Sequence, residues 1–182
     1  RLSELGCRVE PARIPALADN DWNVLTMALY AAEAGAFFER IVAGRHAELH
    51  PALRRRLAFR VEPLGEYVTA LGEWERLRHE VAEAFTRYDL LLTPCSPLPA
   101  HEHGLVELTV RGTVVPARHA LRATLPWDVT GSPALALAFG WSDDGLPIAV
   151  QLVGRHFDEA AVLRAGLALE AASEVIGKRP RP

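Results

Sequence analysis

The sequence predicts an α/β fold from three patterns. Apolar residues recur at three and four positions through residues 64–85, which indicates a helix of about six turns. A continuous apolar run at 88–93 ends at Pro94, as expected of a strand within an α/β sheet. Two more apolar runs flank residues 142–145, and this arrangement predicts an antiparallel hairpin near the C-terminus.

The elements before the long helix are predicted from turn and cap residues. Residues 1–6 end in a glycine typical of a helix stop, and 7–14 form a short strand before a proline. Asp19 or Asn20 is placed to cap the next helix, which the apolar spacing extends to about Val42.

Two helices are predicted in the middle of the chain. A short basic helix at 51–59 carries Arg54–Arg56, which we interpret as a solvated face. The long helix 64–85 places its glutamates off the apolar stripe, and Trp74 lies on the stripe as a core residue.

The second half of the chain alternates strands, turns and helices. The run 88–93 is expected to be buried on both faces, and 106–115 forms a hairpin about Arg111 and Gly112. A helix at 117–130 then leads into the C-terminal strands, which are predicted at 134–139 and 148–153.

The C-terminal hairpin and the last helix have their own turn and cap signals. Gly145 is expected to take a positive φ in the hairpin turn, and Asp158 to cap the last helix. The helix directs one set of side chains inward, Val162, Gly166 and Leu169, and another outward, Arg164, Glu170 and Glu174.

Composition excludes several classes of protein. The 182 residues carry 20 Lys and Arg against 23 Asp and Glu, so the net charge of −3 lacks the basic footprint of a nucleic-acid binder. No apolar run approaches the ~20 residues of a membrane span, and no secretory leader is recognisable. Cys7 and Cys95 are expected to be free thiols of a cytoplasmic protein.

The sequence contains no linker and no internal repeat, so residues 1–182 are predicted to form a single domain.

Motifs for cofactors and metals are weak or missing. The glycine-rich dinucleotide and phosphate loops are both absent, so we expect no nucleotide cofactor. His101 and His103 alternate like metal ligands but lack a complete ligand set, so a solvated loop is the favoured interpretation. Cys95 is interpreted as an inert thiol in a pocket wall rather than as a nucleophile.

One stretch resembles a known family. From Thr124 the chain reads TLPWDVTGSPALALAFGWSDDGLPIAVQLVG. This closely resembles the C-terminal signature of the amidase signature family, Thr-x-x-x-Asn-x-Thr-Gly-x-Pro-Ala, then Gly, then Gly-Leu-Pro-x-Gly-x-Gln-x-x-Gly. The matching residues are Thr124, Thr130, Gly131, Pro133, Ala134, Gly140, Gly145, Leu146, Pro147, Gln151 and Gly154. The segment RYDLLLTP at 87–94 matches as well, so the resemblance covers essentially the whole chain.

The resemblance implies a partial fold. It predicts a mixed-sheet α/β/α sandwich equivalent to the C-terminal half of an amidase signature enzyme. Three positions depart from the family pattern: Asp128 replaces Asn, Ala138 replaces Pro and Ala149 replaces Gly. Leu121 stands where the glutamine-dependent branch tends to carry an acidic residue, which disfavours that branch.

The resemblance also implies amide hydrolysis by residues that this chain does not carry. Family members use a Ser nucleophile, a second Ser and a Lys base around a Gly-Gly-Ser-Ser-Gly stretch in their first half. No such stretch occurs here, and Lys178 and five scattered serines match no motif, so the chain has no catalytic set of its own. No cofactor is implied.

Four residues are candidates for the wall of a substrate pocket. Loops beyond strand ends are where open α/β sheets bind small molecules, and this places Cys95, Ser96, Trp127 and Asp128 near a ligand.

Two hypotheses for function follow. In the first, the chain is the C-terminal half of an amidohydrolase for a small-molecule amide, present as a fragment or a split gene product. Its exposed strand edge is then covered by a second copy in a homodimer, or by a separately encoded N-terminal half that restores the hydrolase. In the second, it is a degenerate non-catalytic domain that acts by binding or self-association.

Overall fold

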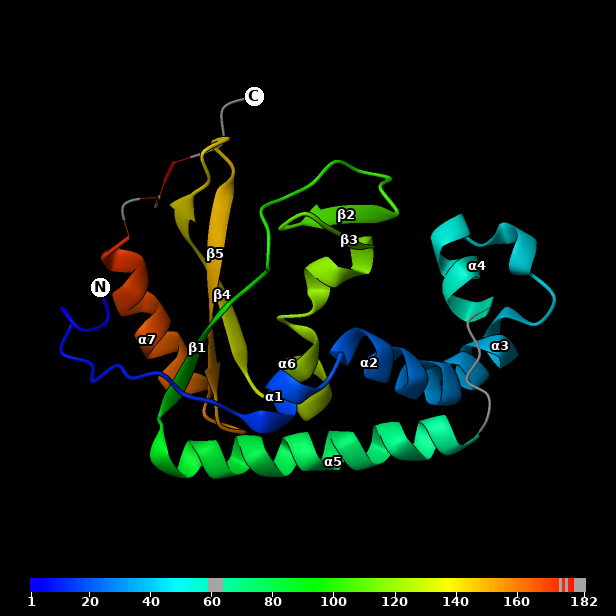
Figure 1. Cartoon of the computed structure of the whole chain (residues 1–182), viewed down its shortest axis with the longest axis horizontal. Helices are drawn as coiled ribbons and strands as arrows, with labels where there is room; N and C mark the ends of the chain where they lie inside the picture. The colour runs from blue at the N-terminus through cyan, green and yellow to red at the C-terminus, as the bar shows by residue number, and fades with distance from the viewer. Residues whose placement is uncertain (59–63, 174, 176, 179–182) are drawn as a thin grey trace.

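The computed structural model describes residues 1–58, 64–173, 175, 177 and 178 (Figure 1). The helices are α1 (Pro15–Asp19), α2 (Trp22–Tyr30), α3 (Ala36–Val42), α4 (Pro51–Ala58), α5 (Leu64–Arg87), α6 (Leu125–Thr130) and α7 (Glu159–Ala171). The strands are β1 (Leu90–Pro94), β2 (Glu107–Val110), β3 (Thr113–Pro116), β4 (Ala134–Trp141) and β5 (Pro147–Gly154). A π-helical turn η1 (Ala31–Gly35) joins α2 to α3, and the 3₁₀ turns are η2 (His46–Glu48) and η3 (Ala117–Leu121).

The main sheet is antiparallel, in the order β1-β5-β4, and lies between two helical layers. In Figure 1, α7 and α6 lie on opposite sides of β4 and β5, and α5 runs below the ends of the strands. The first interface buries Leu77 of α5, Trp127 of α6 and Val153 of β5 in one core. The second buries Leu152 of β5 against α7 in a separate core. The fold is therefore α/β with helices on both faces, as the sequence predicted.

The C-terminal hairpin and the last helix confirm their sequence predictions. Gly145 has φ 76°, and its amide donates to the carbonyl of Ser142 at 2.9 Å to close the β4–β5 turn. The Asp158 carboxylate accepts from the amide of Ala161 at the start of α7. Val162, Gly166 and Leu169 are buried, while Arg164 and Glu170 are exposed; Glu174 lies outside the described residues.

The small hairpin and the N-terminal helix stop are also confirmed. β2 pairs with β3 through a turn in which Arg111 and Gly112 both have positive φ, the geometry whose twist matches that of the strands. Gly6 has φ 88°, and the amides of Gly6 and Cys7 bond back to Ser3 and Leu2. These two bonds form a Schellman motif, so Gly6 ends a helical turn.

The strand predicted at 7–14 is wrong. Within the described residues this segment joins no sheet, and residues 7–13 are exposed. Pro11 lies in its centre and has no amide hydrogen for a ladder bond. Only Ile14 enters the core, at 7% exposure, directly before α1.

Two further boundaries differ from the predictions. Asp21, rather than Asp19 or Asn20, caps α2 by accepting from the amide of Asn23 at 2.9 Å. The helix predicted at 117–130 is split into η3 and α6, because Pro126 cannot donate a hydrogen bond inside a helix and instead occupies the first turn of α6.

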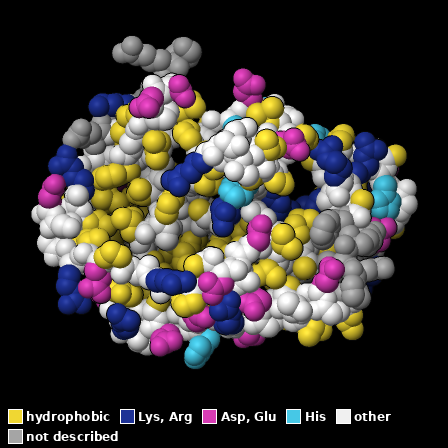
Figure 2. All heavy atoms as spheres, viewed as in Figure 1, with side chains coloured by type: hydrophobic (Ala, Val, Ile, Leu, Met, Phe, Trp, Pro, Cys, Tyr) yellow, Lys and Arg dark blue, Asp and Glu magenta, His cyan; other side chains and the backbone are white. Residues whose placement is uncertain are grey.

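β1 is not buried on both faces. It is an outer strand of the described sheet, and Leu92, which pairs with Leu152 on the face of the sheet that carries α7, is still 48% exposed. Figure 2 shows apolar side chains gathered on the surface in this region.

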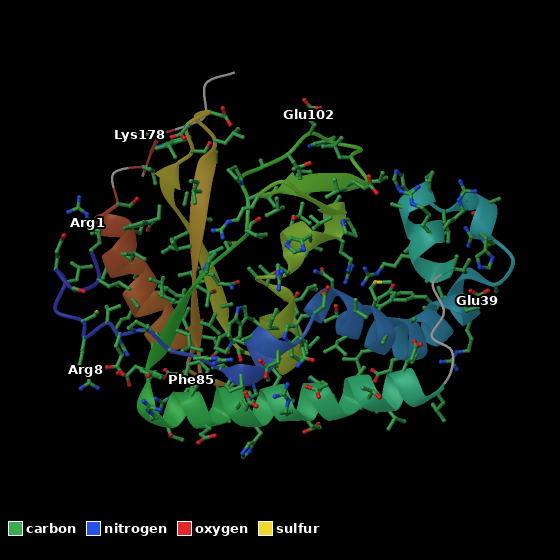
Figure 3. The ribbon with its side chains drawn as sticks, in the orientation of Figure 1. Arg1, Arg8, Glu39, Phe85, Glu102 and Lys178 are labelled. Carbon is green, nitrogen blue, oxygen red and sulfur yellow. The ribbon has the colours of Figure 1, made fainter. Side chains whose placement is uncertain are left out.

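α5 confirms the predicted long helix, but only part of its apolar stripe is in the core. Leu77, Val81 and Phe85 are buried, and Phe85, labelled in Figure 3, points from α5 towards the strands. Leu64 and Val68 in the first turns are exposed. The indole nitrogen of Trp74 donates to the carbonyl of Val129 and so ties α5 to α6.

Candidate functional site

The four predicted pocket residues lie in two places. Cys95 and Ser96 follow β1 and are half-buried. The amide of Cys95 donates to the carbonyl of Ala149 at 3.3 Å, which continues the β1–β5 pairing by one residue. Trp127 and Asp128 are consecutive on α6. Cys95 is a free thiol, as predicted.

Gln151 joins the two segments that carry these residues. Its side-chain amide donates to the hydroxyl of Thr93 at 3.0 Å and to the carbonyl of Ala123 at 3.2 Å. Thr93 lies near the end of β1, and Ala123 lies just before α6. Because Gln151 is only 4% exposed, its amide needs these partners. Gln151 matches the family signature in the sequence, and the structure shows that it holds the β1 end beside the start of α6.

Trp127 lies in the core at 4% exposure. It packs with residues from α1, α2, α5 and β5. Among the described residues, its indole Nε1 has no hydrogen-bond partner although it is buried. A buried donor without an acceptor costs about 1–3 kcal/mol, so this N–H is a position where an acceptor would be favourable.

Asp128 lies on the solvent side of α6. The protein surface around it still removes enough water to raise the pKa of its carboxyl group, because desolvation disfavours the charged form. A raised pKa is expected of a carboxyl group that lies beside a pocket wall and has no cationic neighbour.

Sequence reasoning missed two arginines that lie near each other, Arg56 and Arg118. Arg118 on η3 donates to the hydroxyl of Thr26 on α2 at 3.3 Å, and its Nε is buried without a partner among the described residues. The guanidinium of Arg56 on α4 lies 3.8 Å from the ring centroid of Tyr30. Burial and the nearby charge of Arg56 lower the pKa of Arg118. Figure 2 shows a hollow in the surface between the β2–β3 hairpin and α4, with basic side chains beside it.

The interpretation of Arg54–Arg56 as a solvated face holds for Arg54 and Arg55, which are exposed, but not for Arg56. The contact with Tyr30 forms only when α4 folds back towards α2. No spacing in the sequence signals that contact.

No metal site is found in the part of the chain that the structure describes. No three His, Cys, Asp or Glu side chains are grouped so as to hold an ion there. His101 and His103 are exposed, and Glu102 between them lies at the outside of the β1–β2 connection (Figure 3).

The described serines do not form a catalytic pair with the single lysine. Lys178 lies beyond α7 near the C-terminus (Figure 3), and no described serine hydroxyl is hydrogen-bonded to it. The hydroxyl of Ser132 bonds to Thr130, and that of Ser142 accepts from the amide of Leu146. The nucleophile and base that covalent amide hydrolysis requires are therefore not assembled from these residues.

The layered fold and the Thr124–Gly154 segment define the class of protein as one of the amidase signature folds. A model of the Amidase family matches residues 1–163, so the chain belongs to this family. The chain is 32% identical over 165 residues to the A subunit of glutamyl-tRNA(Gln) amidotransferase from Chloroflexus aurantiacus, covering 84% of this chain and 31% of the relative. It is 35% identical over 136 residues to the corresponding protein of Moorella thermoacetica, covering 71% and 27%.

The solved structures agree with this assignment. A crystal structure of an amidase matches with a TM-score of 0.80 and 29% identity, over 94% of this chain and 39% of the other. The A subunit of glutamyl-tRNA(Gln) amidotransferase from Thermotoga maritima matches with a TM-score of 0.66 and 25% identity, over 95% and 36%. The chain thus spans about a third of the length of these relatives. Several of them belong to amidotransferases, so the expectation drawn from Leu121 gains no support.

Helices that could cross a membrane are not found among the described residues.

Proposed function

We propose that the chain is the C-terminal portion of an amidase signature amidohydrolase, which breaks the C–N bond of a carboxylic amide. It supplies scaffold and pocket wall, and the Ser-Ser-Lys set comes from a different part of the complete protein. The observation that carries this proposal is the match of the family model to residues 1–163 in a chain that has no Gly-Gly-Ser-Ser-Gly stretch.

The proposed pocket wall is formed by Cys95, Ser96, Trp127 and Asp128. Their arrangement is supported by Gln151, whose two hydrogen bonds hold the β1 end and the α6 start together. The unpartnered indole N–H of Trp127 is a donor that a substrate or the remainder of the enzyme can satisfy. Cofactors have no part in the proposed chemistry.

The arginine pair adds to this wall. Arg118 lies on η3, which immediately precedes α6, and its buried Nε has no acceptor among the described residues. Arg56 approaches from α4. Two guanidinium groups, one of which has a buried N–H without an acceptor among the described residues, favour a substrate that presents a carboxylate or carbonyl oxygen to this side of the pocket.

Residues 1–182 are proposed to act as one domain that docks onto an N-terminal half, either encoded separately or joined in the complete protein. The outer strands of the described sheet, β1 and β4, offer edges for pairing. Exposed apolar side chains near them, including Leu92 and Ile148, support burial against a partner. A homodimer is the other arrangement that would cover these edges. The free thiols of Cys7 and Cys95 fit a cytoplasmic location.

The second candidate function is a non-catalytic domain that works through binding or self-association. The same exposed edges favour it, together with Asp128, Ala138 and Ala149, which depart from the family pattern in the signature segment.

The reading frame upstream of the Arg1 codon separates the two candidates. We expect it to encode a glycine-rich double-serine stretch and a lysine, in frame or in a neighbouring gene. An initiation codon directly before Arg1, with no such sequence encoded nearby, would instead support the non-catalytic domain.

A further inference from the structure

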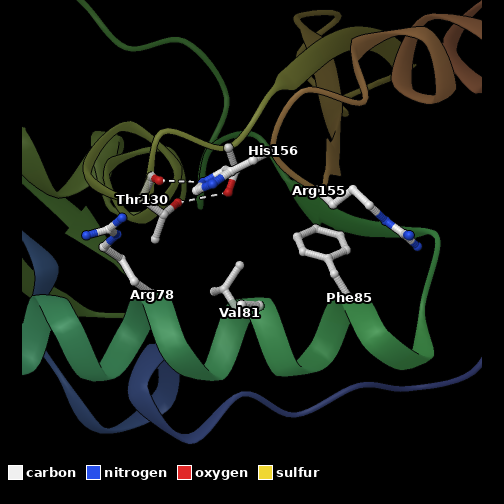
Figure 4. A pocket seen from close by; sticks show the side chains of 8 residues that line it. Arg78, Val81, Phe85, Thr130, Arg155 and His156 are labelled. Atoms are coloured by element: carbon white, nitrogen blue, oxygen red, sulfur yellow. Dashed lines mark hydrogen bonds between the residues drawn. The ribbon is translucent and has the colours of Figure 1, made fainter.

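A cavity of about 280 Å³ lies between α5, the α6–β4 turn and the segment that follows β5 (Figure 4). Its lining comprises Arg78, Val81, Ala82, Phe85, Thr130, Ser132, Arg155 and His156. The four proposed pocket-wall residues do not line it, so this cavity is separate from the proposed substrate pocket and does not depend on the proposed function.

The floor of the cavity is apolar. Val81 and Phe85 are 3% and 6% exposed and lie one helical turn apart on α5. Ala82, beside them, is exposed at the mouth. An apolar cavity of ~150 Å³ is enough to hold a benzene molecule, so this volume accepts one ring or a short alkyl chain with a polar group attached.

The polar lining is basic at one end. Figure 4 shows the side chain of Arg78 turned towards Thr130, whereas Arg155 points outward past Phe85. Arg78 is fixed at the rim by Glu75 at 3.2 Å and by the ring of Trp74, 5.2 Å from its guanidinium carbon. No carboxylate is among the described residues that line the cavity.

The hydroxyls of Thr130 and Ser132 can supply a donor at the same end. They are buried, at 5% and 9% exposure, and lie 3.0 Å apart. Thr130 also bonds to the carbonyl of Trp127, but at 3.3 Å this is the weaker contact. If Thr130 turns its proton to Ser132, the proton of Ser132 becomes free for an acceptor in the cavity.

His156 fixes the wall behind these hydroxyls. Its Nε2 lies 2.7 Å from the carbonyl of Thr130 at the end of α6. Since a carbonyl only accepts, Nε2 carries the proton and donates it. This bond holds the segment after β5 against the α6–β4 turn and keeps the cavity open.

We propose that this cavity binds a small monocarboxylate with an apolar body. The carboxylate lies at the end formed by Arg78 and Ser132, and the apolar body lies on Val81 and Phe85. A guanidinium and a hydroxyl match the two oxygens of a carboxylate, and the apolar floor removes the body of the ligand from water.

Phenylacetate is the test ligand, and its binding is followed by two-dimensional ¹H–¹⁵N NMR of the whole chain. We expect amide signals of residues around Thr130 and Ser132 to shift, with a dissociation constant on the order of 1 mM. Phenylacetone, the neutral analogue of the same shape, should bind several times more weakly because it lacks the charge.

Two variants locate the site, and a third is the control. Arg78→Gln should weaken phenylacetate binding about fivefold, the size expected for a half-exposed ion pair. Ala82→Phe fills the mouth at an exposed position, keeps the charge and should abolish the shifts. Arg87→Gln, on the same helix but outside the cavity, should leave the affinity unchanged.

Three results would each overturn the proposal: no shifts at about 20 mM phenylacetate, which is far above the expected constant; equal binding of phenylacetone; or equal losses in the Arg78 and Arg87 variants. The unliganded spectrum of each variant shows that it is folded before the titration begins.

Discussion

At the scale of single residues, Asp128 is the carboxyl group most affected by desolvation at the proposed pocket wall. Its pKa is raised by burial alone. A raised pKa means that the folded state disfavours the carboxylate, so stability present at low pH is lost as the pH rises through the folded pKa.

We therefore predict that the carboxyl of Asp128 titrates above the ordinary aspartate value of 3.8. A ¹³C NMR titration of its side chain measures this directly. Asp128→Asn should be at least as stable as the parent chain at neutral pH, since it removes the disfavoured charge. A midpoint at or below 3.8 would mean that the group is fully solvated and would remove its support as a pocket residue.

Glu73 shows the opposite behaviour. Its carboxylate accepts from the side chain of Asn20 at 2.8 Å and pairs with Arg76 at 2.8 Å, and these contacts lower its pKa. The lowered pKa gives stability that is present above the unfolded value near 4.5 and lost as the pH falls through the folded pKa.

Glu73→Gln is thus expected to destabilise the chain at pH 7 and to have a smaller effect below the pKa of the folded carboxyl. Urea unfolding of the variant and of the parent chain, at pH 7 and at acid pH, gives the change in the free energy of unfolding at each pH. Glu66→Gln, at an exposed position on the same helix, is the control. An equal loss of stability at both pH values would show that the charge of Glu73 does not cause the destabilisation.

Only part of the candidate site is predictable from the sequence. Cys95 and Ser96 are predicted because they follow a strand end, and Gln151 is singled out because it matches the family signature. The contact between Arg56 and Tyr30, and the closeness of Arg56 to Arg118, depend on how α4 folds back towards α2. Such tertiary contacts leave no periodic trace in the sequence.

At the scale of elements, predictions succeed where one strong local signal dominates. The stripe of α5 and the turn at Gly145 are such signals. Predictions fail where a proline is given too little weight. Pro11 prevents a strand at 7–14. Pro126 can stand only in the first turn of a helix, so the predicted helix 117–130 is divided into η3 and α6. The burial of β1 is overestimated because an apolar composition does not show whether a strand lies at the edge of a sheet.

The contact between β5 and α7 gives a prediction at this scale. A Cβ added at Gly154 would lie 2.5 Å from Cγ2 of Val162, whose β-branched side chain has little freedom to move in a helix. Gly154→Ala should destabilise the chain by about 1–3 kcal/mol.

Gly72→Ala is the matched control, because a Cβ there meets no atom within 4 Å in the interior of α5. It should stabilise the helix by roughly 0.5–1 kcal/mol. The urea midpoints of the two variants test this prediction. A Gly154→Ala variant with the same midpoint as the parent chain would show that α7 shifts freely on the sheet.

At the scale of the whole molecule, the sheet is left with two outer strands among the described residues, β1 and β4. Leu92 on β1 is 48% exposed, and the alanines of β4 that face away from α7 are exposed as well. An unpaired edge beside apolar side chains is a template for association with another chain.

The purified chain is therefore expected to associate at micromolar concentration. Sedimentation equilibrium should give a mass above 19.9 kDa, and Leu92→Lys should reduce it by placing a charge on the edge strand. Phe157→Lys, at a 95% exposed position in the loop between β5 and α7 rather than on a strand, should have no effect. A folded species of 19.9 kDa that binds no hydrophobic dye would show that the edges need no partner.

The central claim is that this chain provides the scaffold of an amidohydrolase without its catalytic set, and hydrolysis of simple amides by the purified chain tests it most directly. We predict no turnover above background, since removing a complete serine-hydrolase set costs on the order of 10⁶ in rate. Turnover that is abolished by Cys95→Ala or Ser96→Ala would contradict the claim, because it would place a nucleophile within these 182 residues.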